Sequence, residues 1–337
     1  MLRTSMLAMV AGTVTLAISQ PAVAGAVNLK VTTCLARNHD YTQAFLQTFV
    51  DPINAKKSDV TLTYLGGPEV TPFKEQAASL KRGLVDIIAC PAAYYSGMFA
   101  EARLPGAQTV SVDEIRKNGA WDMMEEAWNK NLDAHLLAWV FDHGAQIFYT
   151  YFLAEPKQSS KTGLDLNGLK MRSTPLYNPF LMAMGATTVV MAPGDVYAGL
   201  QRGVVDGLAW PWGSVAKYGW QRFLKYRVKP GYFSASQPLI INLDKWKGLS
   251  KAQQDLLTSQ ARVYETDGAA IVIQKGKEDD AKLKESGVQD IELKGDVAKA
   301  YLETIYSAKW AQNDGLHYTV DYKKLKSLLY PPPHKGS

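Results

Sequence analysis

The chain has 337 residues, of which 47% are hydrophobic and 20% are charged, and its formal net charge is +5. This composition is typical of a globular protein and excludes a disordered or fibrous chain. The basic residues form no stripe interleaved with aromatic residues, so the sequence does not predict a partner nucleic acid.

The first residues have the organisation of a secretory signal. Arg3 precedes an apolar run from Met6 to Ile18, and the small residues 22–24 then form a cleavage box. This pattern predicts a signal peptide over residues 1–26. A membrane anchor is the alternative, but the run is shorter than the ~20 residues that span a bilayer. We therefore expect an exported protein, located in the periplasm and not itself membrane-spanning.

The next segment alternates strand and helix patterns. Because helices of this length connect successive strands, the alternation predicts right-handed crossovers and a parallel sheet. A capping box at Ser111 and Glu114 opens a further helix, which is followed by two strands. The predicted strands are 29–35, 59–65, 84–90, 135–141 and 146–153, and the predicted helices are 41–56, 71–83 and 111–132.

A second alternating series follows a polar connector at 154–168. The later chain carries a strand at 238–243 and a helix from the Ser250–Gln253 capping box to about Glu285. The series itself comprises strands 169–173, 187–190 and 204–209 with helices 176–184 and 194–202.

These patterns predict an α/β fold with two lobes, a hinged cleft and a long helix spanning both lobes. Residues 27–145 and 238–270 are assigned to lobe I, and residues 146–237 and 271–337 to lobe II. The halves share the same order of elements without a repeat of fixed period.

The chain has two cysteines, Cys34 and Cys90, and each ends a strand-like run. They could be neighbours in the sheet, but the sequence contains neither a CxxC pair nor a dense disulfide framework. We therefore expect two buried thiols rather than a disulfide.

The segment LNGLKMRSTP, residues 166–175, places Arg172 at the end of a buried strand. Ligands of open α/β sheets bind outside the carboxyl ends of the strands. The planar guanidinium matches a carboxylate and stays charged, so we expect Arg172 to bind an anion. A surface salt bridge is the alternative. The same edge is expected to carry residues 34–39, 66–69, 91–95 and 210–212.

Motifs for dinucleotide, phosphate, zinc-protease and nucleophile-elbow chemistry are absent from the sequence. Ser214–Lys217 fits SxxK and Lys161–Gly163 fits KTG, but their order is reversed from that of serine acylases, so we interpret both as coincidences. The histidines show no metal-ligand spacing, and we predict no metal and no cofactor. His39 is a candidate site residue because it follows the first strand at the cleft.

Residues 166–172 and the run DVYAGLQRGVVDGLAWP, residues 195–211, resemble DctP-type periplasmic solute-binding proteins of TRAP transporters. The resemblance implies a periplasmic binding protein fold that closes around an organic acid, with Arg172 holding the carboxylate. It also implies delivery to DctQ/DctM-like membrane permease subunits and no catalysis. A periplasmic enzyme on the same fold and an ABC-type carrier are the alternatives.

Three departures from the family pattern bear on the ligand. Gln146 stands where many members carry a second arginine, and Trp210 stands where many carry a polar residue. Keto-acid-binding relatives place a metal-binding Glu at the position of Ala209, so a bound cation is not expected. Family counterparts of Glu69 often lie near the ligand, but Glu69 could equally serve as a charge at the N-terminus of the helix from Thr71.

The remaining cleft candidates are aromatic. Large rings there would stack on a flat or apolar ligand, although each could instead belong to the core. We therefore expect an aromatic or bulky monocarboxylate, with an aliphatic keto or hydroxy acid as the alternative. The aromatic candidates are Tyr94, Tyr95, Phe148, Tyr177, Trp210 and Trp212.

Overall fold

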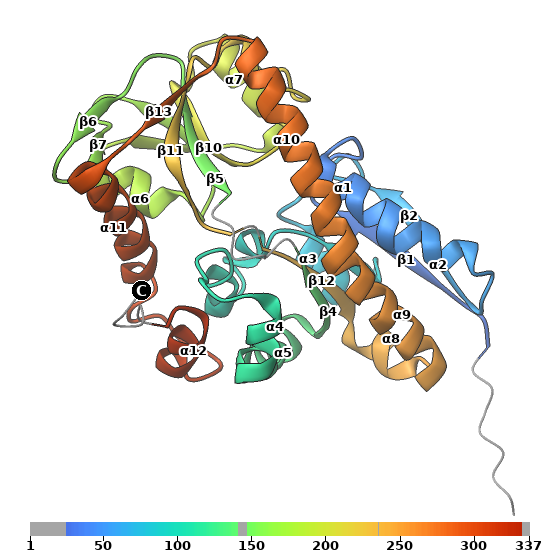
Figure 1. The fold of residues 1–337 in the computed structure, drawn as a ribbon. Helices are drawn as coiled ribbons and strands as arrows, with labels where there is room; N and C mark the ends of the chain where they lie inside the picture. The colour runs from blue at the N-terminus through green and yellow to red at the C-terminus, as the bar shows by residue number, and fades with distance from the viewer. Residues whose placement is uncertain (1–24, 141–146, 235, 332–337) are drawn as a thin grey trace, which may run out of the picture.

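The computed structural model describes residues 25–140, 147–234 and 236–331. The predicted signal peptide and Gln146 lie outside these residues. The described chain forms two mixed sheets with helices packed around them, and the predicted α/β class is confirmed (Figure 1).

The first sheet contains the strands predicted near the N-terminus and the one predicted at 238–243. Strands β1 and β2 pair in parallel, as do β1 and β3, whereas β12 is antiparallel to both β3 and β4. The strand order is β2 (Val60–Gly66), β1 (Val27–Thr33), β3 (Ile87–Ala89), β12 (Gln237–Asn242) and β4 (Ala134–Val140).

The helices predicted for this half form with altered ends. The first is continuous, from α1 (Asp40–Phe45) through a π-helical turn to α2 (Asp51–Ala55). The second is shorter than predicted, since α3 covers only Gln76–Lys81. The third is split at Gly119, which has a φ of 90°, into α4 (Val112–Asn118) and α5 (Ala120–Leu132). A left-handed residue of this kind ends a helix, and glycine adopts it at little cost.

The second sheet contains the three strands of the second alternating series, the strand predicted at 146–153, and two strands that the sequence analysis missed. The missed strands are β11 and β13, which pair in parallel at one edge. A hairpin of β6 (Lys157–Ser159) and β7 (Gly163–Asp165) also occupies the predicted connector. The strand order is β13 (Gln289–Glu292), β11 (Tyr226–Tyr232), β5 (Phe148–Phe152), β10 (Gly207–Pro211), β8 (Lys170–Ser173) and β9 (Thr187–Val190).

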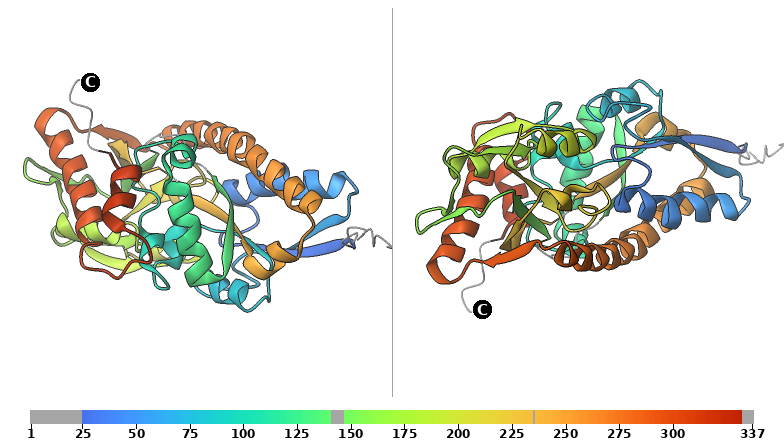
Figure 2. Two further views of the ribbon diagram at one scale, coloured as in Figure 1. Left: turned by 90° about the horizontal axis from the view of Figure 1, so that it is seen from below. Right: turned by 90° about the horizontal axis from the view of Figure 1, so that it is seen from above.

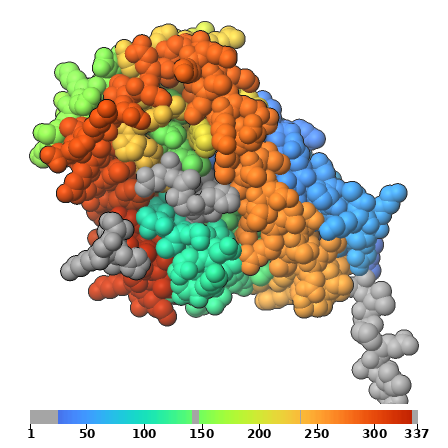
Figure 3. All heavy atoms as spheres, viewed as in Figure 1, coloured from blue at the N-terminus to red at the C-terminus, as the bar shows by residue number. Residues whose placement is uncertain are grey.

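The long helix forms as predicted and ends at Glu285. It comprises α9 (Lys251–Val263), a π-helical turn and α10 (Ala269–Glu285), and both halves of the Ser250–Gln253 capping box are present. Figures 1 and 2 show it running from the first sheet to the second, and Figure 3 shows it along one face of the molecule. None of the helices in residues 25–331 that the structure describes is long and apolar enough to cross a membrane.

The remaining helices bear on the lobe assignment, which stays a prediction. Helices α6 (Asn178–Ala183) and α11 (Gly295–Ala311) pack together, and α7 (Val196–Gln201) follows β9. The last helix, α12 (Tyr322–Leu329), packs instead against α4 and α5, and its Leu328 carbonyl oxygen accepts from Asn118. The chain therefore returns to the first sheet's side after α11.

Cys34 and Cys90 form a disulfide, so the prediction of two separate thiols is wrong. Thr33 of β1 pairs in register with Ala89 of β3, which places the next residue of each strand side by side. Their Cα atoms are 5.0 Å apart, within the range that a disulfide requires. The bond joins two strand ends at the edge of the first sheet where ligands were expected.

Candidate functional site

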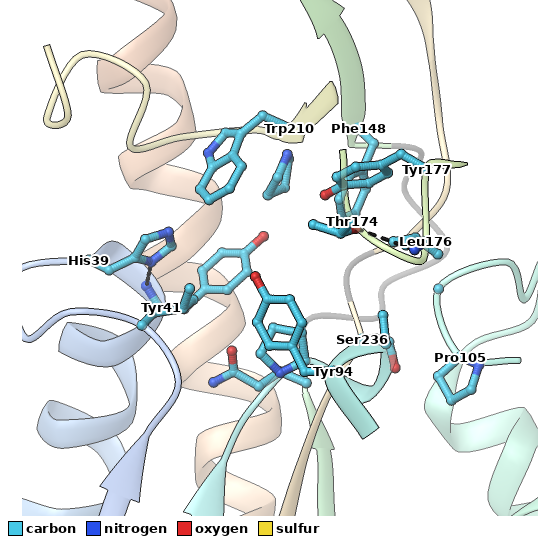
Figure 4. A pocket seen from close by; sticks show the side chains of 16 residues that line it. His39, Tyr41, Tyr94, Pro105, Phe148, Thr174, Leu176, Tyr177, Trp210 and Ser236 are labelled. Atoms are coloured by element: carbon cyan, nitrogen blue, oxygen red, sulfur yellow. Dashed lines mark hydrogen bonds between the residues drawn. The ribbon is translucent and has the colours of Figure 1, made fainter. Parts of the chain in front are cut away.

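A cavity lies where the loops after β1, β3, β8 and β10 converge, and we call it the aromatic pocket (Figure 4). The space free of protein atoms in this cavity, including the part that opens to solvent, has a volume of about 580 Å³. The convergence follows from the parallel strands, whose carboxyl ends share one edge of each sheet. The lining residues are Leu35, His39, Tyr41, Pro91, Ala93, Tyr94, Pro105, Gly106, Phe148, Thr174, Leu176, Tyr177, Trp210, Pro211, Ser236 and Gln237.

Arg172 is fully buried at the end of β8, behind the wall of this pocket. Its Nε and Nη2 donate to the carbonyl oxygen of Met191 at 3.1 and 2.8 Å. Its Nη1 is buried and has no hydrogen-bond partner among the described residues. The guanidinium carbon lies 5.2 Å from the centre of the Trp210 ring, within the range of a cation–π contact. One N–H group of a buried cation is therefore left without an acceptor in the described part of the chain.

The pocket lining itself carries no charged carboxylate, lysine or arginine among the described residues. Burial raises the pKa of Tyr94, with the nearby Arg172 opposing the shift, and burial also raises the pKa of Tyr41 and Tyr177. These hydroxyls are therefore neutral at physiological pH. The wall is aromatic and apolar, with Phe148 and Tyr177 in contact at 5.7 Å between ring centres.

His39 contributes a neutral donor. Its Nδ1 accepts the backbone N–H of Tyr41 at 3.1 Å, so in the neutral ring the proton lies on Nε2. Burial lowers the pKa of His39 to about 4, although the Asp40 carboxylate opposes the shift. Nε2 is buried and has no hydrogen-bond partner among the residues described. It can therefore donate to a ligand oxygen without adding a charge.

Asp40, which follows His39 in the chain, is a buried carboxylate that is already paired. Ser214 donates to it at 2.6 Å, and Lys217 forms an ion pair with it and also donates to the carbonyl oxygen of Asn38. These contacts tie the start of α1 to the loop after β10, across the two sheets. Asp40 is therefore neutralised by Lys217 and is not the counterion of Arg172.

Five of the predicted candidates line the aromatic pocket: His39, Tyr94, Phe148, Tyr177 and Trp210. Figure 4 shows Trp210 and Phe148 from the second sheet facing His39 and Tyr94 from the first. Trp210 is fixed by its own indole N–H, which donates to the Gly213 carbonyl oxygen at 3.1 Å. The structure thus brings these side chains together beside Arg172.

Three other predicted residues lie away from the lining. Tyr95 is 1% exposed and packs edge-to-face on Trp128, with ring centres 5.1 Å apart. Trp212 packs against Gly276 of the long helix, where a Cβ would lie 2.6 Å from the indole. Glu69 is exposed and accepts the N–H of Gly67 at 2.7 Å, so it stabilises its own turn.

The sequence analysis missed Tyr41, the 105–106 loop, Ser236 and Gln237. Tyr41 follows His39 directly, but its helical spacing with Phe45 favoured a core position. Ser236 directly precedes β12 and Gln237 is its first residue, and the antiparallel direction of β12 brings its amino end to the ligand edge. That direction was the missing signal, because a parallel strand would have placed them at the opposite edge.

The described residues contain no group of three or more histidine, cysteine, aspartate or glutamate side chains that could hold a metal ion. Ala209 stands where keto-acid-binding relatives are expected to carry a metal-binding Glu. It is buried within β10, where it lies opposite Thr150 of β5 in the sheet. The expected absence of a metal stays a prediction.

Comparisons with known proteins agree on one family. The model of DctP, the bacterial extracellular solute-binding protein family 7, matches residues 69–308. A monocarboxylate 2-oxoacid-binding periplasmic protein of Nostoc sp. is 30% identical over 104 residues. That match covers 30% of this chain and 28% of the relative, so it spans less than a third of either protein.

Two solved structures share the fold. A TRAP periplasmic solute-binding protein from Desulfovibrio salexigens, with bound orotic acid, has a TM-score of 0.73 at 16% identity and covers 85% of this chain and 92% of that one. One from Pseudomonas putida F1, with bound D-glucuronate, has a TM-score of 0.69 at 21% identity and covers 86% and 98%. These are solute-binding proteins rather than enzymes, and the family model spans more than two thirds of the chain. The chain therefore belongs to the DctP family of bacterial extracellular solute-binding proteins.

Proposed function

We propose that this member of a family that binds organic acids takes its ligand in the aromatic pocket, holding the carboxylate on Arg172. We further propose that the preferred ligand is a monocarboxylate with an aromatic or bulky apolar body, such as a benzoate- or cinnamate-like acid. The observation that carries the proposal is the fully buried Arg172 guanidinium, whose Nη1 has no partner among the described residues.

A buried charge is costly unless it is paired and hydrogen-bonded. Arg172 has one carbonyl acceptor, one ring contact and a side-chain hydrogen bond with Tyr94, and it forms no carboxylate ion pair in the described part of the chain. A ligand carboxylate at Nη1 would supply the missing countercharge through a charge-assisted hydrogen bond. The ligand would thereby relieve an unfavourable feature of the empty protein, which favours tight binding.

The proposed ligand body follows from the pocket wall. Aromatic contacts contribute about 0.5–1.5 kcal/mol beyond the burial of apolar area. The lining offers rings such as Trp210, Phe148 and Tyr177 but no second cation. A second carboxylate placed among these rings would be buried without a countercharge, so a dicarboxylate is disfavoured in this pocket.

A 2-oxo acid is the second candidate. The Nostoc relative is named for binding monocarboxylate 2-oxoacids. The unpaired His39 Nε2–H and the Tyr94 hydroxyl are neutral donors of the kind that an oxo group accepts. An aliphatic oxo acid would use these donors and leave the rings largely unused, which makes the two candidates separable.

A thermal-shift screen tests the proposal. A ligand that binds only the native state raises the melting temperature according to its concentration and Kd. We expect benzoate and cinnamate to stabilise the protein more than pyruvate, succinate or glucuronate at equal ionic strength. Benzamide, which lacks the carboxylate, should have no effect. Stronger stabilisation by succinate, or equal stabilisation by benzamide, would contradict the proposal.

The mechanism we propose is capture followed by delivery. His39 and Tyr94 come from loops of the first sheet, whereas Arg172 and Trp210 come from the second. A ligand that contacts both sets favours the closed arrangement, because only differential contacts shift such an equilibrium. The pairing of Asp40 with Lys217 and Ser214 would stabilise the same arrangement. The closed form would then dock on DctQ/DctM-like permease subunits, after export directed by residues 1–26.

A further inference from the structure

A second cavity adjoins the aromatic pocket, and we call it the Arg103 pocket. It shares Tyr94 and Thr174 with the aromatic pocket and is lined from both sheets' loops. Met191, whose carbonyl oxygen holds Arg172, belongs to its wall, and so does Gln312 at the end of α11. The two cavities are therefore neighbours across the Tyr94 ring.

The Arg103 pocket is lined by two cations, Lys74 and Arg103, and by no carboxylate. Neither cation forms an ion pair among the described residues. Lys74 is exposed, and its ammonium lies 5.7 Å from the centre of the Phe73 ring, within the range of a cation–π contact. The pocket is thus a positively charged concavity without a built-in anion.

A buried lysine interacts electrostatically with Arg103. Lys309 of α11 is 1% exposed and forms no carboxylate ion pair with any residue the structure describes. Burial, and next the charge of Arg103, lower the pKa of Lys309 to about 7. Glu101 forms no ion pair with Arg103 or Lys309 among the described residues: its Oε1 accepts the backbone N–H groups of Thr319 and Val320, and its buried Oε2 has no hydrogen-bond partner there.

We propose that the Arg103 pocket is a second anion-binding site, which holds a small carboxylate or oxyanion on Arg103 and Lys74 independently of Arg172. The guanidinium can bind such an anion through two parallel hydrogen bonds. The buried Gln312 Nε2, which has no partner among the described residues, supplies a further donor. An anion here would also relieve the repulsion between Arg103 and Lys309.

The position of this site suggests its use. Because the two pockets share a wall, an acid held on Arg103 lies beside the Arg172 site. Clefts lined by one sign of charge concentrate ions of the opposite sign and speed their association. The anion could be the carboxylate of an arriving solute or an inorganic oxyanion, and the two sources differ in the experiment below.

The test uses the full-length mature protein carrying Arg172→Ala, so that binding at the first site is removed. Malonate and, separately, phosphate are titrated by calorimetry at constant ionic strength. We expect malonate to bind at one site and Arg103→Gln to weaken it at least tenfold. Arg82→Gln, an exposed charge at the end of α3, is the matched control and should change affinity less than twofold. Tighter binding of malonate than phosphate identifies an arriving carboxylate, and the reverse identifies an inorganic oxyanion.

Absence of malonate and phosphate binding in Arg172→Ala, or equal binding after Arg103→Gln, would overturn the second site. If Arg103→Gln does not fold, Lys74→Gln replaces it, and unchanged binding there has the same meaning. This test of the Arg103 pocket is independent of the test of aromatic-acid binding at Arg172. Benzoate binding that survives Arg172→Ala would contradict the proposed function and leave the malonate result as it stands.

Discussion

Two buried arginines at strand ends of the same sheet have opposite surroundings. Arg227 of β11 donates to Asp290 at 2.7 and 3.1 Å and forms a second ion pair with Asp280. Burial alone would lower the pKa of Arg227, but the hydrogen bonds that it donates to these carboxylates, and their charges, raise it. Arg172 of β8 is more deeply buried and has no carboxylate partner in the described chain. A structural arginine carries its anion within the fold, whereas Arg172 lacks one, as a ligand-binding residue would.

The largest expected effect is on binding by the arginine without a partner. Arg172→Ala should weaken binding of the preferred acid at least 100-fold, about 3 kcal/mol, since truncating one side of a buried charge pair typically costs 2–5 kcal/mol or more. Calorimetric titration measures it. Arg202→Ala, an exposed arginine just after α7, is the control and should bind normally. If Arg172→Ala lowers the affinity for the acid by less than threefold, the contrast drawn between Arg172 and Arg227 is wrong.

The paired arginine should show the reverse behaviour. Arg227→Ala leaves Asp280 without its cation and Asp290 with Lys229 alone, and both carboxylates are about one-third exposed, so solvent screens part of the loss. We expect the free energy of unfolding to fall by about 2 kcal/mol, with ligand affinity per folded molecule unchanged. Urea denaturation measures the free energy of unfolding, and calorimetry measures the ligand affinity. A normal stability with impaired binding would reverse the assigned roles.

Lys309 extends the comparison to a buried cation whose pKa is lowered to about 7, against an ordinary value of 10.5. Between these pH values the unfolded chain binds more protons than the folded one, so stability rises with pH. The slope for one such group is at most about 1.4 kcal/mol per pH unit. Urea denaturation between pH 7 and 9 should show this rise, and Lys309→Met should remove it. An identical slope in the variant would show that Lys309 is paired in solution.

The smallest effect concerns the two tryptophans that flank Pro211. Trp210→Leu should weaken an aromatic acid about three- to tenfold, because a ring contact contributes about 0.5–1.5 kcal/mol. Trp212→Leu, on the face packed against Gly276, should lower stability and leave affinity unchanged. Thermal-shift titrations of both variants with benzoate and pyruvate sharpen the ligand assignment. Equal losses for both acids in Trp210→Leu would favour the aliphatic oxo acid.

Much of the arrangement could be predicted because local pattern and global fold agree. The capping box at Ser250 and Gln253 located the start of the long helix, and the apolar strand before Arg172 located its buried end. Parallel strands then dictated which loops meet, and His39, Tyr94 and Trp210 indeed line the pocket. These inferences needed only the periodicity of side chains and the geometry of parallel sheets.

The sequence-based predictions were wrong or incomplete where contacts between distant segments of the chain determine the position of a residue. Tyr94 and Tyr95 are adjacent in one short helical turn, so which of them faces the pocket depends on the packing of Trp128. The disulfide depends on the register of β1 against β3, and Ser236 depends on the direction of β12. Local sequence does not specify register or direction, because both are set by contacts with distant strands.

The most direct measurement is a crystal structure of the protein with the acid that stabilises it best in the screen. The account predicts a carboxylate oxygen within about 2.7–2.9 Å of the Arg172 Nη1 atom, as charge-assisted hydrogen bonds require, and a ligand body against Trp210 and Phe148. A ligand bound away from that guanidinium, or an uncharged ligand in the aromatic pocket, would contradict it.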